Sequence, residues 1–280
     1  MGANLKEVRE RIKSVISTQQ ITKAMKMVSA AKLRRAQQAI GQMRPYSLKL
    51  NEMLTNILSN LDADANSSYG IVREPKNVLI VVVTSNRGLC GAFNTNIIKA
   101  SIALVESRYQ EVRKNGGLHF YFIGKKGYDG MKNRYRDCTL NRDHVALFTD
   151  LNFEASTLVS NQLLEAFQNG TYDAIHIVYG HFKNAGVQFS ETESFLPVVK
   201  QASTDKKKVS KADYIFEPSQ NVLLETLIPQ ILHTQFFKTL LDTHASEHGA
   251  RMTAMDKASE NAEEMLKELR INYNKARQEA

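Results

Sequence analysis

The sequence predicts an α/β protein in which a long antiparallel coiled coil of the N-terminal and C-terminal helices carries an inserted α/β domain with a mainly parallel sheet. Two observations predict the coiled coil: an unbroken heptad pattern from residue 241 to residue 280, and a second long helical pattern at the start of the chain. A third observation predicts the inserted domain, because short apolar strands alternate with helical segments between these two patterns.

The C-terminal coiled-coil helix is expected over residues 219–280. Apolar and small residues recur there at steps of four and three, the spacing of the seam in a left-handed coiled coil. The seam includes Leu241, Ala245, His248, Met252, Met255, Ala262, Leu266 and Leu269. A seam needs a partner helix. Because the other long helical pattern is at the N-terminus of the same chain, we expect an intramolecular antiparallel pair.

The N-terminal coiled-coil helix is expected over residues 1–61. Its first apolar stripe consists of Leu5, Val8, Ile12 and Val15. The next positions on that stripe, Gln19 and Thr22, are polar, and apolar residues resume around the helix at Ile21, Met25 and Val28. This pattern predicts a phase shift that turns the helix toward a second environment. Pro45 is expected to kink the helix.

The inserted domain is expected over residues 77–218, after a polar linker at residues 62–76. The apolar run Asn77–Thr84 is typical of a strand buried on both faces. Further strands are predicted at Leu118–Ile123 and Ala174–Tyr179, an edge strand at Val187–Leu196 and a short strand at Tyr214–Phe216; helices are predicted at Phe93–Arg113, Lys125–Arg136 and Ala155–Gln168. The alternation indicates a small Rossmann-like sheet.

Positive charge is concentrated in one helix. The net charge is +8, yet residues 1–49 alone hold 11 Lys and Arg against two Asp and Glu, whereas residues 219–280 hold seven against nine. A solvated helix face explains such a distribution as well as an anionic partner does. That partner would be a polyanion, a membrane surface or an acidic protein loop.

The cysteines and the apolar runs limit the compartment. Cys90 and Cys138 have no metal-binding spacing and are predicted to be reduced thiols of a cytosol-like compartment. No apolar run reaches the length that a membrane span requires, and the N-terminus lacks the apolar core of a secretory signal. We therefore expect a soluble protein.

Candidate chemical groups are few. The turn Ser85–Gly91 lies between a strand and a helix, where α/β folds place ligands, but it lacks the Gly-Lys-Ser/Thr end of a phosphate loop. A tight turn is therefore favoured over nucleotide binding. His244 and His248, four residues apart, could hold a metal, although packing in the seam is favoured. Cys90 has no identifiable histidine base. The sequence predicts no catalytic residues, metal site or cofactor.

Three segments resemble a known family. Residues 12–15 and 18–32 (IKSV and TQQITKAMKMVSAAK) resemble the N-terminal helix of the gamma subunit of F-type ATP synthase. Ser85–Gly91 is similar to the central loop of that family, and Ala245–Ala262 is similar to its C-terminal signature. The three segments occur in the family's order and span the chain.

The resemblance implies a rotating shaft. The terminal helices would lie inside a hexamer of alpha and beta subunits, and the α/β domain would lie outside it, near the epsilon subunit and the membrane ring of c subunits. ATP binds the hexamer in this family, so the chain would be a non-catalytic subunit without a cofactor. The apparent lack of a transit peptide favours a bacterial source, with the complex on the cytoplasmic side of the inner membrane.

The resemblance also implies contact residues. Lys23, Met25 and Lys26 would lie near an acidic lever loop of the beta subunit, and Arg277 and Gln278 match a pair that contacts a beta-subunit catch loop. The chain departs from the family at Asn86, where Asp is usual. It also ends at Ala280, where family members continue, so a truncated sequence is expected.

Two other functions compete with the shaft. One is a nucleotide-binding enzyme that uses the turn Ser85–Gly91, which direct ATP titration would reveal. The other is a nucleic-acid binder that uses the basic residues 1–49, with an affinity that falls steeply with salt. The near-absence of aromatic residues before Tyr46 argues against base stacking.

Overall fold

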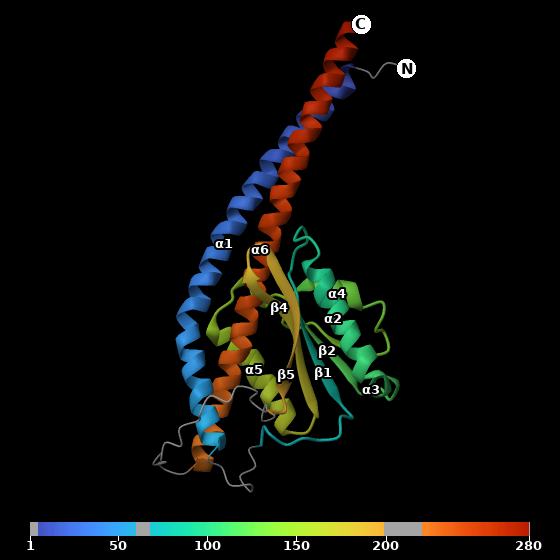
Figure 1. The fold of residues 1–280 in the computed structure, drawn as a ribbon. Helices are drawn as coiled ribbons and strands as arrows, with labels where there is room; N and C mark the ends of the chain where they lie inside the picture. The colour runs from blue at the N-terminus through green and yellow to red at the C-terminus, as the bar shows by residue number, and fades with distance from the viewer. Residues whose placement is uncertain (1–4, 60–67, 199–219, 280) are drawn as a thin grey trace.

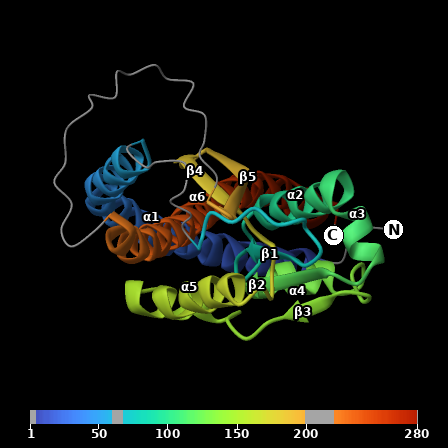
Figure 2. The same ribbon diagram turned by 90° about the horizontal axis from the view of Figure 1, so that it is seen from below.

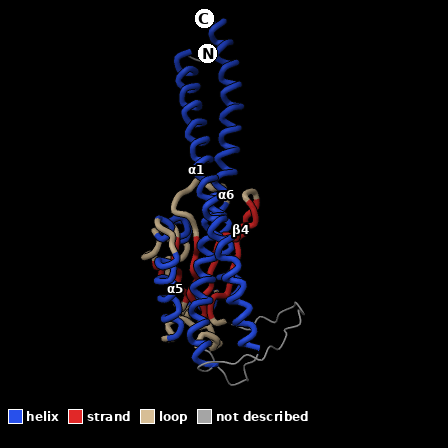
Figure 3. Tube along the Cα trace, turned by 90° about the vertical axis from the view of Figure 1, so that its left-hand side faces the viewer, coloured by secondary structure: helices blue, strands red, loops and turns tan. Residues whose placement is uncertain are grey.

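Two long helices form the axis of the molecule. The structure, a computed structural model, describes residues 5–59, 68–198 and 220–279. Helix α1 (Leu5–Ser59) and helix α6 (Gln220–Glu279) run antiparallel, side by side, and their upper parts project beyond the rest of the chain (Figures 1 and 3). Both continue through an internal proline, Pro45 in α1 and Pro229 in α6.

The buried stripe of α1 runs straight along the helix. Its positions alternate by three and four: Val8, Ile12, Val15, Gln19, Thr22, Lys26, Ser29, Leu33, Ala36 and Ile40 are all buried or half-buried. The predicted phase shift is therefore wrong, and Ile21 and Val28 are 57% and 58% exposed. The polar positions Thr22 and Ser29 are buried instead, and Thr22 meets the small polar residue Ser259 of α6.

The seam of α6 lies against α1. Met252 is half-buried, and the other seam residues named from the sequence, Leu241, Ala245, His248, Met255, Ala262, Leu266 and Leu269, are buried. Ala245 packs with Leu33 and Ala36 of α1, and Ile40 and Met252 close the same cluster. Small residues on both helices therefore allow close approach where the coil passes the sheet.

A five-stranded mixed sheet flanks the lower half of α6. The strands are β1 (Val78–Val83), β2 (Leu118–Ile123), β3 (Thr139–Asn141), β4 (Ala174–Asn184) and β5 (Val187–Leu196), in the order β3-β2-β1-β4-β5. All neighbours pair in parallel except β4 and β5, which form an antiparallel hairpin at the predicted edge. The three-residue strand β3 was not predicted, and the predicted strand at 214–216 lies outside the described residues.

Two apolar cores cover the sheet. On one face, Val78, Ile80 and Val82 pack against α2 (Phe93–Arg108), α3 (Gln110–Lys114) and α4 (Lys125–Met131). On the other face, Leu79, Val81 and Val83 pack against α5 (Phe153–Gln168) and the lower part of α6. Figure 2 shows α2 and α5 on opposite sides of the strands. A short 3-10 helix (Leu147–Thr149) precedes α5. Helix α6 is thus both a core helix of the α/β layer and half of the projecting coil.

Candidate functional site: the projecting coil and its junction with the sheet

A polar segment interrupts the apolar seam above the sheet. The hydroxyl oxygens of Thr22 and Ser259 are buried and 2.7 Å apart across the coil. Each hydroxyl also has an acceptor in its own helix: the Gln19 carbonyl is 3.0 Å from the Thr22 hydroxyl, and the Met255 carbonyl is 2.8 Å from that of Ser259. One turn away, Lys26 forms an ion pair with Asp256 across the coil. Sequence analysis missed this segment because the two short polar residues meet only when the helices are aligned.

The projecting coil presents apolar and basic side chains to solvent. Beside Ile21 and Val28, Met27 is exposed, and Lys23 is exposed next to them. Met25 and Lys26 are half-buried at the edge of the seam. The structure therefore places the predicted contact residues of α1 on one stretch of helix. Within it, Lys23 faces solvent, whereas Lys26 is engaged by Asp256.

The other predicted contact residues lie at the tip. Arg277 and Gln278 are exposed in the last turn of α6, beside the start of α1. Nearby, the guanidinium of Arg9 donates a hydrogen bond of 2.8 Å to the Tyr273 hydroxyl. At 1.5 Å per residue, the tip is about 30 Å from the polar segment. The two predicted contact regions are therefore separate places on the coil.

The turn after β1 is closed by its own side chains. The Ser85 amide donates to Asn94 Oδ1 at 3.0 Å, and the Ser85 hydroxyl donates to the Arg87 carbonyl at 2.6 Å. The Asn86 side chain accepts a hydrogen bond from the Lys125 amide at 3.2 Å. The side chains of Ser85 and Asn86 are thus engaged by the turn and by the residues packed on it, and the tight-turn interpretation accounts for them.

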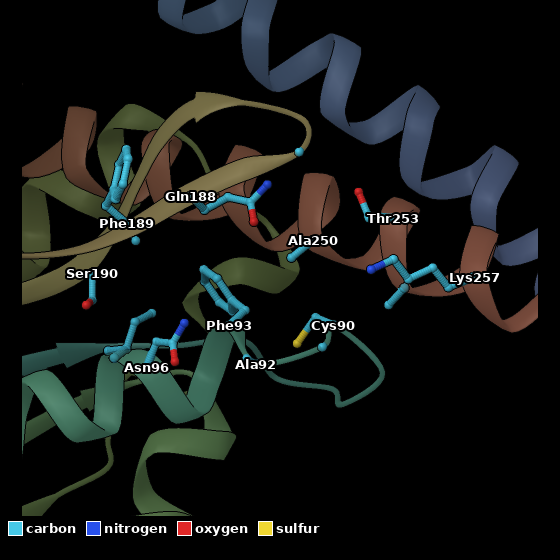
Figure 4. A pocket seen from close by; sticks show the side chains of 15 residues that line it. Cys90, Ala92, Phe93, Asn96, Gln188, Phe189, Ser190, Ala250, Thr253 and Lys257 are labelled. Atoms are coloured by element: carbon cyan, nitrogen blue, oxygen red, sulfur yellow. The ribbon is translucent and has the colours of Figure 1, made fainter.

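Helix α6 occupies the crevice where α/β sheets commonly bind ligands. The sheet order reverses between β1 and β4, and such switch points are the usual ligand sites. Here the Ser246 hydroxyl of α6 donates to the Gly180 carbonyl of β4 at 3.0 Å. A groove of about 250 Å³ remains beside it, lined in part by Cys90, Phe93 and Lys257 (Figure 4). This volume is below the ~300–1,000 Å³ of typical small-molecule pockets.

The two thiols are not activated. Burial raises the pKa of the Cys90 thiol above its ordinary value, and burial raises the pKa of Cys138 to about 11. A reactive cysteine needs the opposite shift, because the thiolate is the nucleophile. Both side chains are free cysteines in the structure.

Two of the histidines of α6, the half-buried His244 and the buried His248, form a pair. The Nε2 atoms of His244 and His248 are 3.1 Å apart, and the His244 ring stacks on Phe148. Burial lowers the pKa of His244 to about 4 and that of His248 to about 3, so both rings are neutral at pH 7. Within the described ranges, no group of three or more Cys, His, Asp and Glu side chains is arranged to hold a metal.

These features define a class of protein: a two-helix shaft whose lower half is built into an α/β layer. Among the described residues, no helix combines the length and the apolar character needed to cross a membrane. Comparison with known proteins then gives the family. Residues 4–280 match the family model described as ATP synthase.

Curated relatives agree with that match. The ATP synthase gamma chain of Cytophaga hutchinsonii is 51% identical over 278 residues, covering 99% of this chain and 94% of the relative. That of Christiangramia forsetii is 50% identical over 276 residues, covering 99% and 93%. The chain therefore belongs to the family of ATP synthase gamma chains, and the resemblance noted in the sequence is confirmed.

Solved structures support the same fold. A chain of the Euglena gracilis mitochondrial ATP synthase, from a structure described as the rotor in rotational state 1, superposes with a TM-score of 0.62. It is 23% identical, and the match covers 98% of both chains. A chain from the OSCP/F1/c-ring structure of the same enzyme in rotational state 3 has a TM-score of 0.64, covering 98% of this chain and 89% of that one. The predicted fold class is confirmed.

Proposed function

We propose that this chain is the rotating central shaft of an F-type ATP synthase. It couples rotation driven by a flow of protons or sodium ions to ATP synthesis or hydrolysis at the beta subunits, and it makes and breaks no covalent bond itself. The observation that carries this proposal is the projecting coil, a bare two-helix rod that rises from a broader α/β base (Figure 3). Such a shape suits a rod that is enclosed by partner subunits at its projecting end and is turned at its broader base.

The two ends of the molecule have different partners in this proposal. The alpha and beta subunits surround the projecting coil, and the epsilon subunit and the c-ring meet the α/β base. The chain is then a peripheral component on the cytoplasmic side of a bacterial inner membrane. Its basic N-terminal helix serves protein contacts and binds no nucleic acid.

The contacts with the beta subunits are proposed at two levels of the coil. Lys23, Met25 and Lys26 form the lower level, and Arg277 and Gln278 form the tip. At the lower level the exposed apolar residues Ile21 and Val28 add surface that is unusual for an isolated helix face. Since Asp256 already pairs with Lys26, the charge available to an acidic partner loop is mainly that of Lys23.

Co-expression with the cognate alpha and beta subunits tests the shaft. We expect one copy of this chain per hexamer of alpha and beta subunits, with faster steady-state ATP hydrolysis than the hexamer alone. Failure to assemble, also after a family-like extension is added beyond Ala280, would refute the proposal. Micromolar binding of ATP to the chain alone would favour the nucleotide-binding alternative.

Substitution of the outward apolar residues tests the lower contact. The double variant Ile21→Gln and Val28→Gln should leave the stability of the isolated chain within about 0.5 kcal/mol, because both side chains are exposed. It should reduce the ATP hydrolysis rate of the assembled complex. Leu158→Gln is the matched control, since Leu158 is 66% exposed on α5, away from the coil. Equal rates for both variants would contradict the lower contact.

A further inference from the structure

Helix α6 is bonded to the sheet at three points where it begins to project. The Thr243 hydroxyl accepts a hydrogen bond from the Gly180 amide at 3.3 Å, and the Ser246 hydroxyl donates to the Gly180 carbonyl. Two turns higher, the Thr253 hydroxyl donates to the Ala185 carbonyl, in the β4–β5 turn, at 3.2 Å. These contacts bind α6 to one side of the sheet.

Arg251 binds α6 to the turn after β1. Its Nη2 donates to the carbonyls of Arg87 and Gly88 at 3.2 and 3.3 Å, and its Nη1 donates to Glu247 at 2.6 Å. The side chains of Arg251 and Glu247 are only 8% and 9% exposed. A planar guanidinium can bond in several directions at once, which a lysine ammonium on its single nitrogen cannot reproduce. Arg251 therefore links the helix and the turn rigidly.

The turn after β1 contains a strained backbone conformation at Leu89. Leu89, the residue that follows these two carbonyls, has φ +62, a conformation that is rare for a branched side chain, and its side chain is 64% exposed. Such backbone strain persists only where surrounding contacts enforce it. The hydrogen bonds from Arg251 act on the two residues immediately before Leu89 and add to the bond from the Ser85 hydroxyl to the Arg87 carbonyl.

Just above this level, the polar contacts of α6 are made with α1 and no longer with the sheet. From Asp256 onward α6 bonds to α1, through the Lys26–Asp256 ion pair and the Thr22–Ser259 contact. Residues 243–253 are therefore the level at which α6 passes from the sheet to the free coil. The hydrogen bonds at this level, together with the apolar packing below them, therefore resist any twist of the coil relative to the sheet.

We propose that Thr243, Ser246, Glu247, Arg251 and Thr253 form a collar that fixes the angle of the coil relative to the α/β base, with Arg251 as its positioning residue. The inference rests on the proposed function, because a fixed angle matters only in a shaft that is turned. The collar marks the boundary between the torsionally stiff base and the more flexible coil.

The test uses the assembled, membrane-reconstituted ATP synthase with variants of this chain. Arg251→Lys keeps the charge opposite Glu247 but loses the two carbonyl bonds. The double variant Glu247→Gln and Arg251→Gln removes the pair without leaving a buried charge. Thr253→Val removes a further bond at nearly constant shape. The matched control is Glu263→Gln with Lys267→Gln, which neutralises an exposed ion pair at the same spacing on α6.

Three measurements follow for each complex: amide exchange of residues 86–91, torsional stiffness from the angular fluctuations of a probe fixed to the shaft, and ATP-driven pumping of protons or sodium ions relative to ATP hydrolysis. In Arg251→Lys we expect amide exchange roughly 10-fold to 100-fold faster, as expected for loss of charge-assisted hydrogen bonds. Stiffness and the pumping-to-hydrolysis ratio should fall below those of the control. Thr253→Val should lower the stiffness without changing exchange in the turn.

The possible outcomes separate the two proposals. If the wild-type complex pumps and Arg251→Lys and the double variant match the control in stiffness and pumping, the collar is wrong and the shaft is retained. If the wild-type chain itself does not support ATP-driven pumping, the proposed function fails. If a variant of Arg251 changes exchange in the turn but not stiffness, Arg251 only orders the turn and the collar is again refuted.

Discussion

Lys23 and Lys26 are three residues apart, yet the structure gives them different tasks, and this difference is open to a direct test. Lys26 pairs with Asp256 across the coil, with side chains 41% and 46% exposed, whereas Lys23 is exposed. Charge reversal at Lys23 should therefore change contacts with a partner subunit only. Charge reversal at Lys26 should also weaken the coil itself.

The expected cost of Lys26→Glu has two parts. Losing a half-exposed ion pair costs about 0.2–1 kcal/mol of unfolding free energy. Placing a second carboxylate about 4 Å from Asp256 adds about 1 kcal/mol of repulsion at the dielectric constant of water. The sum is about 1–2 kcal/mol. Lys23→Glu should stay within about 0.5 kcal/mol, since it is an exposed substitution.

Urea unfolding of the isolated chain, followed by circular dichroism, measures these free energies. The charge-swapped variant Lys26→Glu with Asp256→Lys should recover most of the stability, because the pair is restored in reverse. ATP synthesis by the reconstituted complex measures the contact with the partner subunit. We expect Lys23→Glu to lower this synthesis rate while the stability of the chain stays unchanged. Equal destabilisation by the two reversals, or no recovery on swapping, would refute the assignment of Lys26 to the coil.

Two further predictions concern the α/β base. Burial lowers the pKa of His176 to about 4, with its Nε2 2.6 Å from the Tyr109 hydroxyl, so the folded chain holds it neutral while the unfolded chain protonates it below pH 6.5. The unfolding free energy should thus be highest above pH 6.5 and should fall as the pH drops toward 4, by about 3 kcal/mol from this residue. Urea titrations at pH 7 and pH 5 measure this fall, which should be smaller in His176→Leu than in the wild-type chain. An equal fall in both chains would contradict this origin. Phe236→Ala, at a fully buried side chain of α6 packed on Phe195 of β5, should cost about 3–5 kcal/mol, whereas Leu158→Ala at the exposed face of α5 should cost little; similar urea midpoints would show that α6 is not part of the core.

The sequence by itself determined the architecture, because its signals are local and periodic. The three-four spacing from Leu241 onward predicted the coil, and the apolar run Asn77–Thr84 predicted a strand buried on both faces. The turn Ser85–Gly91 already lacked the residues of a phosphate loop. Each of these inferences depends on neighbours within one helix or one strand, so no long-range contact was needed.

Only the tertiary structure decided which face of α1 is buried and how the coil joins the sheet. Thr22 and Ser259 are 237 residues apart, and their buried hydroxyls meet across the coil while each also has a carbonyl acceptor in its own helix. With Thr22 and Ser29 on the buried face of α1, Ile21 and Val28 lie outward, against the local hydrophobic pattern. Likewise, Arg251 meets the carbonyls of Arg87 and Gly88 across more than half the chain. Every residue has a backbone carbonyl, so the sequence does not indicate which carbonyls accept a hydrogen bond from a distant side chain. Such bonds are defined only in the folded chain.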